Sequence, residues 1–141
     1  MTARQTVHAT AIAFGGQGVL IRGASGRGKS ALALDLMAFG AALIADDRVH
    51  LARAGDRIVA SCPETLLGMI EARGLGILRA DPAEPRALVC VVDLDHAEAE
   101  RLPPLRHVTL LGCDLPLIHA AGATRFAPAL LQFLRAGRIE A

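Results

Sequence analysis

Apolar residues in this chain gather in short runs that are broken every few residues by glycine, aspartate or proline. Runs of this length, rich in Val, Ile, Leu and Ala, are typical of buried β-strands. We therefore predict strands at residues 7–13, 18–22, 41–45, 49–53, 57–61, 88–93, 108–111 and 115–118. Glycine-containing turns at residues 14–17 and 54–56 favour hairpins between the strands that flank them.

Other stretches have helical character. Residues 30–39 follow a glycine-rich loop and precede Gly40, which is a typical helix stop, and residues 126–136 form an amphipathic pattern. Residues 63–69 predict a short helical turn. The order of strands and helices predicts an α/β fold. The 141 residues show no repeat or linker, so we expect residues 1–141 to form a single domain.

Composition narrows the class of partner. The formal net charge is +1 and basic residues are spread along the chain, which argues against binding of DNA or RNA. Trp and Tyr are absent and Phe occurs only four times, too few rings for a base-stacking surface. We expect no membrane span and no signal peptide, because no apolar run is long enough for either. Three widely spaced cysteines, Cys62, Cys90 and Cys113, are typical of reduced thiols in a cytoplasmic protein.

Residues 23–30 carry the most specific motif. They read Gly-Ala-Ser-Gly-Arg-Gly-Lys-Ser and match the phosphate-binding loop G-x-x-x-x-G-K-[ST] in full. The predicted strand before them and helix after them favour this interpretation over a glycine-rich turn with a chance Lys-Ser. In such a loop backbone N–H groups surround phosphate oxygens, Lys29 neutralises the outer phosphates and Ser30 ligates Mg²⁺. We therefore expect a nucleotide to contact Gly23, Ala24, Ser25, Gly26, Arg27, Gly28, Lys29 and Ser30.

Two acids, Asp46 and Asp47, follow the predicted strand at residues 41–45. In open α/β sheets ligands bind at the carboxyl ends of strands, although adjacent aspartates also favour turns and helix caps. In a phosphoryl-transfer site Asp46 would orient Mg²⁺ with Ser30 and Glu71, because all three supply hard oxygen ligands. Asp47 would then accept the proton of the acceptor hydroxyl.

Glu71 and Arg73 lie in the segment Glu-Ala-Arg-Gly-Leu-Gly-Ile at residues 71–77. On an open surface they would form an ion pair of little energetic value. Gly74 and Gly76 indicate instead a close approach of backbone, which favours a site in which Arg73 clamps phosphate. His8 precedes the strand that leads into the loop; taken alone, a histidine there is more often structural than catalytic.

His8, the phosphate loop, Ala-Asp-Asp-Arg-Val at residues 45–49 and the segment at residues 71–77 together resemble the catalytic domain of bacterial HPr kinase/phosphorylase. The resemblance covers most of residues 6–80 with specific motifs. It implies a mixed sheet with flanking helices around a phosphate-loop core, the type shared with phosphoenolpyruvate carboxykinase. It also implies hexamers, a catalytic role for His8, and ATP- and Mg²⁺-dependent phosphorylation of a serine in HPr or an HPr-like protein. In the reverse reaction inorganic phosphate attacks phosphoserine and pyrophosphate is released.

The sequence departs from that family in two respects. Family members carry an additional N-terminal domain, whereas this sequence begins almost at the catalytic core, so we expect no N-terminal regulatory domain. They also have a Pro- and Arg-rich loop that is tied to dephosphorylation and includes a catalytic arginine. Residues 115–126 retain one arginine there, Arg125, which is the candidate for that role. The resemblance therefore supports the kinase activity more strongly than the phosphorylase activity.

Two other functions stay open. One is a kinase of a small metabolite, because this fold type also suits such enzymes. The other is a non-catalytic nucleotide sensor, which would bind nucleotide in the loop but would not use Asp46 and Asp47 for phosphate transfer. ATP is the expected phosphate donor, and pyrophosphate is the alternative donor.

Overall fold

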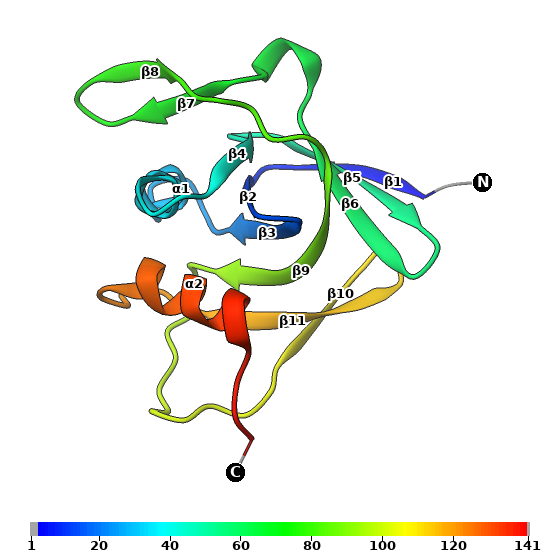
Figure 1. The fold of residues 1–141 in the computed structure, drawn as a ribbon, viewed down its shortest axis with the longest axis vertical. Coiled ribbons are helices and arrows are strands. Elements are labelled where there is room, and N and C mark those ends of the chain that lie inside the picture. Colours follow the sequence, from blue (N-terminus) through cyan, green and yellow to red (C-terminus); the bar gives the residue numbers. More distant parts are fainter. Residues whose placement is uncertain (1–2, 141) are drawn as a thin grey trace.

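The structure is a computed structural model that describes residues 3–140 of the chain. A curled nine-stranded mixed sheet carries helices α1 (Lys29–Ala38) and α2 (Phe126–Ala136) on one face, and a separate hairpin of β7 (Met69–Ala72) and β8 (Gly76–Arg79) projects beside α1 (Figure 1). The remaining elements are β1 (Arg4–Val7), β2 (Thr10–Phe14), β3 (Gln17–Arg22), β4 (Ala42–Ala45), β5 (Val49–Ala54), β6 (Arg57–Ser61), the 3₁₀ turn η1 (Glu64–Leu66), β9 (Arg86–Asp93), β10 (His107–Leu110) and β11 (Cys113–His119).

The strand order brings four carboxyl ends to one edge of the sheet. The order is β1-β5-β6-β9-β3-β2-β4, with β11 also paired to β9 and β10 paired to β11. β9 pairs in parallel with both β3 and β11. β4 runs in the same direction as β3 because both are antiparallel to the strand between them, β2. The segments that follow β3, β4, β9 and β11 therefore meet along the edge where α/β sheets bind ligands.

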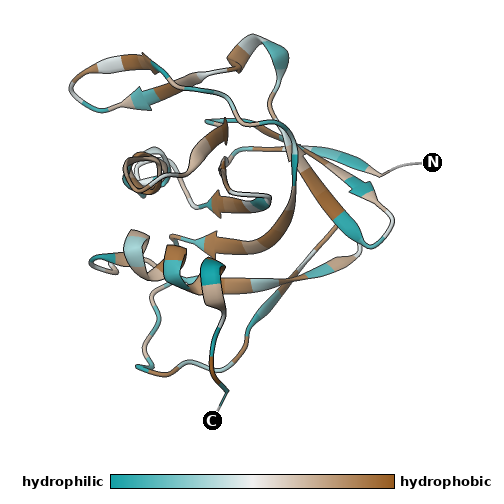
Figure 2. Cartoon of the chain, viewed as in Figure 1, coloured by the Kyte–Doolittle hydropathy of each residue, from teal (hydrophilic) through white to brown (hydrophobic). Residues whose placement is uncertain are grey.

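The central strands are covered on both faces. Ile21 packs into one cluster with Leu36 of α1 and Leu130 of α2, whereas the adjacent Leu20 packs into a second cluster with Ile58 of β6. Successive side chains of a strand point to opposite faces, so a strand buried on both sides reads as a continuous apolar run. This is why the apolar runs of the sequence mark the interior strands, which are brown in Figure 2.

Most of the predicted elements are confirmed, with shifts of one or two residues at their ends. The predicted strand at residues 7–13 is divided between two strands. β1 ends at Val7 and β2 begins at Thr10, because His8 and Ala9 are not in strand conformation. β1 pairs with β5, whereas β2 pairs with β3 and β4, so the break lets one continuous stretch serve two parts of the curled sheet.

The segment at residues 69–79 forms a hairpin that the sequence pattern did not predict. The expected close approach of backbone at Gly74 and Gly76 is wrong, because a Cβ added at either residue would meet nothing within 4 Å. Their φ angles are instead +89° and +118°, values that L side chains rarely adopt. These glycines therefore turn the chain between β7 and β8.

The cysteines are free thiols, with Cys90 and Cys113 buried and Cys62 half-buried. Within residues 3–140, no helix has the length and apolar character needed to cross a membrane.

Candidate functional site

The phosphate loop connects β3 to α1. Gly26 and Gly28 have φ angles of +85° and +96°, so the loop uses backbone conformations that favour glycine. The first helical hydrogen bond of α1 joins the Leu32 N–H to the Gly28 carbonyl. The N–H groups immediately before Leu32 have no partner within the helix and lie at its partially positive end, where phosphate binds favourably.

Lys29 is buried, and its side chain folds back over its own loop. Its Nζ donates hydrogen bonds to the carbonyl oxygens of Gly23 at 2.6 Å and Ala24 at 3.3 Å. Among the described residues no carboxylate pairs with this ammonium group. These two neutral carbonyls accept two of its three hydrogens and leave its charge uncompensated, so the loop holds a positive charge ready for an anion.

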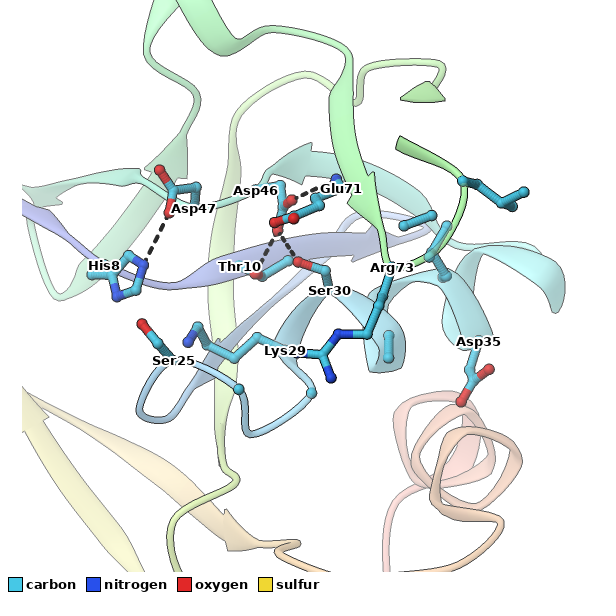
Figure 3. A pocket seen from close by; sticks show the side chains of 16 residues that line it. His8, Thr10, Ser25, Lys29, Ser30, Asp35, Asp46, Asp47, Glu71 and Arg73 are labelled. Atoms are coloured by element: carbon cyan, nitrogen blue, oxygen red, sulfur yellow. Dashed lines mark hydrogen bonds and ion pairs between the residues drawn. The ribbon is translucent and has the colours of Figure 1, made fainter. Parts of the chain in front are cut away.

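Asp46, immediately after β4, collects hydrogen bonds from three parts of the chain. Its Oδ1 accepts from the hydroxyls of Ser30 at 2.7 Å and Thr10 at 2.9 Å, and its Oδ2 accepts from the Glu71 backbone N–H at 3.0 Å. The carboxyl group is buried, and Figure 3 shows these bonds converging on it. Asp46 therefore ties the start of α1 to β2 and to the hairpin.

The donor set around Asp46 fits Mg²⁺. Ser30, Asp46 and Glu71 line one pocket and offer a hydroxyl and two carboxylates. Mg²⁺ selects hard oxygen ligands, takes few of them from the protein and keeps several waters. These three residues are the ones that would hold the ion, because their side chains offer only oxygen ligands.

Asp47 points to a different partner. Its φ of +72° is rare for a residue other than glycine, and the turn directs its Oδ1 to within 2.9 Å of His8 Nε2. A carboxylate only accepts hydrogen bonds, so Nε2 of His8 carries the hydrogen. The break between β1 and β2 is what places His8 there, and the Ala9 N–H fixes it by donating to the Asp47 carbonyl at 3.3 Å.

These groups surround a pocket of about 640 Å³ (Figure 3). Most of the residues proposed from the sequence contribute to it: His8, Ser25, Gly26, Gly28, Lys29, Ser30, Asp46, Asp47, Glu71 and Arg73. Sequence reasoning missed Thr10, Leu34 and Asp35, which also line it. Thr10 carried a signal, since it is a polar residue at the start of an apolar strand and is fully buried.

Arg125 does not line this pocket. It lies at the start of α2 and lines a neighbouring cavity of about 440 Å³ together with Arg27. The two cavities share Gly28, Ala31 and Asp35, so Arg125 faces the other side of the same loop and helix.

Comparisons with known proteins identify the family of the chain. Residues 1–82 match the family described as HPr Serine kinase C-terminal domain. The HPr kinase/phosphorylase of Bordetella pertussis is 47% identical over 74 residues, which cover 52% of this chain and 24% of that protein. The HPr kinase/phosphorylase of Cupriavidus necator is 37% identical over 127 residues, covering 82% of this chain and 39% of that protein. This chain therefore spans well under half the length of these relatives.

The fold agrees with a solved structure of the same kind. The Hpr(Ser) kinase/phosphatase from Coxiella burnetii superposes with a TM-score of 0.80 and 26% sequence identity, covering 93% of this chain and 88% of that chain. The predicted α/β core of HPr kinase type is thereby confirmed. With its sequence motifs, its sheet and these similarities taken together, the chain belongs to the HPr serine kinase C-terminal domain family.

Proposed function

We propose that residues 1–141 form a single catalytic domain that transfers the terminal phosphate of ATP to a serine of HPr or an HPr-like carrier, with Mg²⁺ as cofactor. The observation that supports this most is the convergence of an uncompensated lysine, a buried aspartate and a His8–Asp47 pair on one pocket. Phosphoryl transfer needs positioning, charge neutralisation and a base for the acceptor proton, and each of these groups fits one of those tasks.

Each residue has a distinct role in this proposal. Lys29 exchanges the Gly23 and Ala24 carbonyls for phosphate oxygens, and Arg73 clamps phosphate from the hairpin. Ser30, Asp46 and Glu71 hold Mg²⁺, which neutralises charge on the phosphates. Asp47 accepts the proton as the serine oxygen bonds to the terminal phosphorus, and the bond from that phosphorus to the ADP oxygen breaks. His8 orients the Asp47 carboxylate through Nε2, leaving its other oxygen for the substrate hydroxyl.

Exposed apolar side chains beside the pocket favour a protein as acceptor. Leu75 and Ile77 of the hairpin are 79% and 65% exposed, and Leu67 just before it is 53% exposed. Leu75 also lines the pocket, and exposed apolar side chains beside a polar pocket favour a protein partner. A small metabolite would not need them. We therefore assign the hairpin to contact with the carrier.

The test is phosphate transfer to purified HPr, followed by mass spectrometry, with wild type beside Asp47→Asn. We expect wild type with ATP and Mg²⁺ to add one phosphate to a serine. Asp47→Asn should abolish transfer and keep nucleotide binding. Asp56→Asn is the matched control, because Asp56 lies in the exposed turn between β5 and β6 and should leave the rate unchanged.

Other outcomes identify other functions. Turnover of ATP with small acceptors while HPr stays unlabelled would indicate a metabolite kinase. Binding of ATP without transfer, unaffected by Asp47→Asn, would indicate a nucleotide sensor. Running the same assay with pyrophosphate as donor, and with phospho-HPr plus inorganic phosphate, tests the alternative donor and the reverse reaction. Arg125→Ala should affect only the reverse reaction.

The resemblance extends the proposal to assembly and location. We propose a homo-oligomer, a hexamer by family resemblance, acting in the cytoplasm, where such a carrier is phosphorylated. Light scattering coupled to size exclusion measures the mass directly, and a monomer at assay concentration would remove the oligomer from the proposal.

A further inference from the structure

Asp93 is a buried acid that the phosphate pocket does not use. Among the described residues the buried polar or charged side chains are Thr10, Lys29, Asp46 and Asp93, and only Asp93 lies outside that pocket. Its residue is 3% exposed at the carboxyl end of β9. Burying a charge costs free energy unless other groups compensate it, so the groups around Asp93 indicate its role.

Two histidines lie against this carboxylate. His119 ends β11 and is the direct register partner of Asp93 in the parallel pair, so their side chains are neighbours on the sheet. His96 returns from the loop after β9, with its Nδ1 at 3.1 Å from Asp93 Oδ2. The imidazole rings of His96 and His119 lie 5.2 Å apart. One ligand atom from each of the three residues lies within 4.8 Å of the other two.

The backbone holds this cluster in place. The Ala120 N–H donates to the Asp93 carbonyl at 2.9 Å, and the Ala121 N–H donates to the His96 carbonyl at 3.0 Å. The segments after β9 and β11 are thus bonded to each other directly beside the three side chains. Such a frame limits the conformational freedom that ligand binding would otherwise have to remove.

We propose that Asp93, His96 and His119 bind a divalent transition-metal ion of the zinc class, at a site separate from the Mg²⁺ site. Two imidazole nitrogens and one carboxylate oxygen form a donor set typical of Zn²⁺, whereas Mg²⁺ selects oxygens. The 3.1 Å between Asp93 Oδ2 and His96 Nδ1 is close to the ligand spacing of a tetrahedral ion. His96 is exposed, so a fourth position is open to water.

Arg22 supplies the decisive contrast. Its Nη2 lies 3.4 Å from the same Asp93 Oδ2 and its side chain is partly exposed, so it competes with a metal ion for that oxygen. If the cluster serves only to compensate the charge of Asp93, Arg22 stabilises it, and removal of Arg22 would not strengthen metal binding. If the cluster binds metal, removal of Arg22 frees the oxygen and strengthens binding. The two interpretations therefore predict opposite effects of one substitution.

The site would also act on the phosphate loop. Asp93 Oδ1 accepts from the Asp95 N–H at 2.7 Å, and Asp95 Oδ1 accepts from the Ala24 N–H of the loop at 3.0 Å. A metal ion that fixes Asp93 and His96 would fix Asp95 between them. This consequence rests on the proposed function, whereas metal binding itself does not.

The experiment titrates the metal-free protein with Zn²⁺ by calorimetry and with Co²⁺ by visible absorption, both in excess Mg²⁺ to saturate the oxygen site. We expect one equivalent to bind, with the absorption of tetrahedral Co²⁺. His119→Ala and His96→Ala should each lower affinity by more than the about 10- to 100-fold expected for loss of an outer-shell partner. His50→Ala is the matched control, because His50 is an exposed histidine of β5 and should leave binding unchanged.

Arg22→Gln is the second variant and should bind Zn²⁺ more tightly than wild type. Weaker binding by Arg22→Gln would overturn the proposal, as would equal binding by wild type and His119→Ala, or no binding by wild type. Circular dichroism confirms that each variant is folded. Phosphate transfer is not the readout, so failure of this inference is distinct from failure of the proposed function.

Discussion

The hydroxyl of Ser30 donates to Oδ1 of Asp46 at 2.7 Å, which joins the last residue of the phosphate loop to the first acid after β4. Asp46 Oδ2 meanwhile accepts from the Glu71 N–H. In Asp46→Asn the amide oxygen can still accept from the Ser30 hydroxyl. The amide nitrogen would then face the Glu71 N–H, which is also a donor, so that hydrogen bond is lost. We expect a loss of about 1–3 kcal/mol in unfolding free energy, measured by urea denaturation.

The same variant should separate two kinds of nucleotide binding. We expect Mg²⁺ to increase the nucleotide affinity of wild type but not that of Asp46→Asn. The affinity for nucleotide without Mg²⁺ should be the same in both, as measured by calorimetry. Ser30→Ala should behave similarly with a smaller loss of stability. An unchanged Mg²⁺ effect in both variants would contradict the assignment of these residues to the metal.

The positive φ of Asp47 predicts an unusual order of stability. Asp47→Ala loses the hydrogen bond to His8 and keeps a backbone conformation that is unfavourable for residues with a Cβ. Asp47→Gly loses the same bond but relieves the backbone, so it should be more stable than Asp47→Ala by about 1 kcal/mol in chemical denaturation. Neither variant should transfer phosphate. If alanine is the more stable of the two, the turn is not strained as described.

Gly18 and Gly16 form a matched pair. A Cβ at Gly18 would lie 2.9 Å from the Ala87 carbonyl oxygen on β9, whereas one at Gly16 would meet nothing within 4 Å. Gly18→Ala should therefore push β3 away from β9 and cost about 1–3 kcal/mol in unfolding free energy. Gly16→Ala should change it by less than about 0.5 kcal/mol. Equal thermal midpoints for the two variants would exclude this contact as a constraint.

Burial of Cys90 raises the pKa of its thiol to about 12, from an ordinary value of 9.0. The native state therefore keeps the thiol protonated at a pH where the unfolded state ionises it. The contribution of this thiol to the free energy of unfolding is therefore complete below pH 9. It should fall by about 1.4 kcal/mol per pH unit as pH rises from 9 toward 12. Urea denaturation of wild type and Cys90→Ala at several pH values measures the difference, which should shrink only on the alkaline side.

The elements that the sequence predicted well are those with one dominant physical cause. β3 and β9 are buried on both faces, so their apolar runs are long and their bounds fall close to the predicted ones. α1 is bounded by the glycine-rich loop before it and by Gly40 after it. The phosphate loop was predicted because its backbone conformation requires glycines at fixed spacing. Asp46 and Asp47 could be placed because the acids directly follow a buried strand.

Other features depend on contacts between distant residues. The hydrogen bond of Thr10 to Asp46 joins residues 36 positions apart, and the pairing of His119 with Asp93 arises from the register of β11 on β9. No local pattern encodes either contact. The β7–β8 hairpin was missed because each strand has only four residues. β7 alternates exposed and buried residues, but β8 buries none of its residues fully and so lacks the alternation of a half-buried strand.

The connection between β1 and β2, formed by His8 and Ala9, lies opposite the segment between β4 and β5, because the Ala9 N–H donates to the Asp47 carbonyl. At this point the pairing of β1 with β5 ends and the pairing of β2 with β4 begins. Two constraints therefore set the length of each connection: the position of the side chain that it carries, His8 or Asp47, and the register of the strands that it joins. Deleting one residue there would turn a whole strand inside out, so evolution can exchange amino acids at these joints but cannot readily change their number.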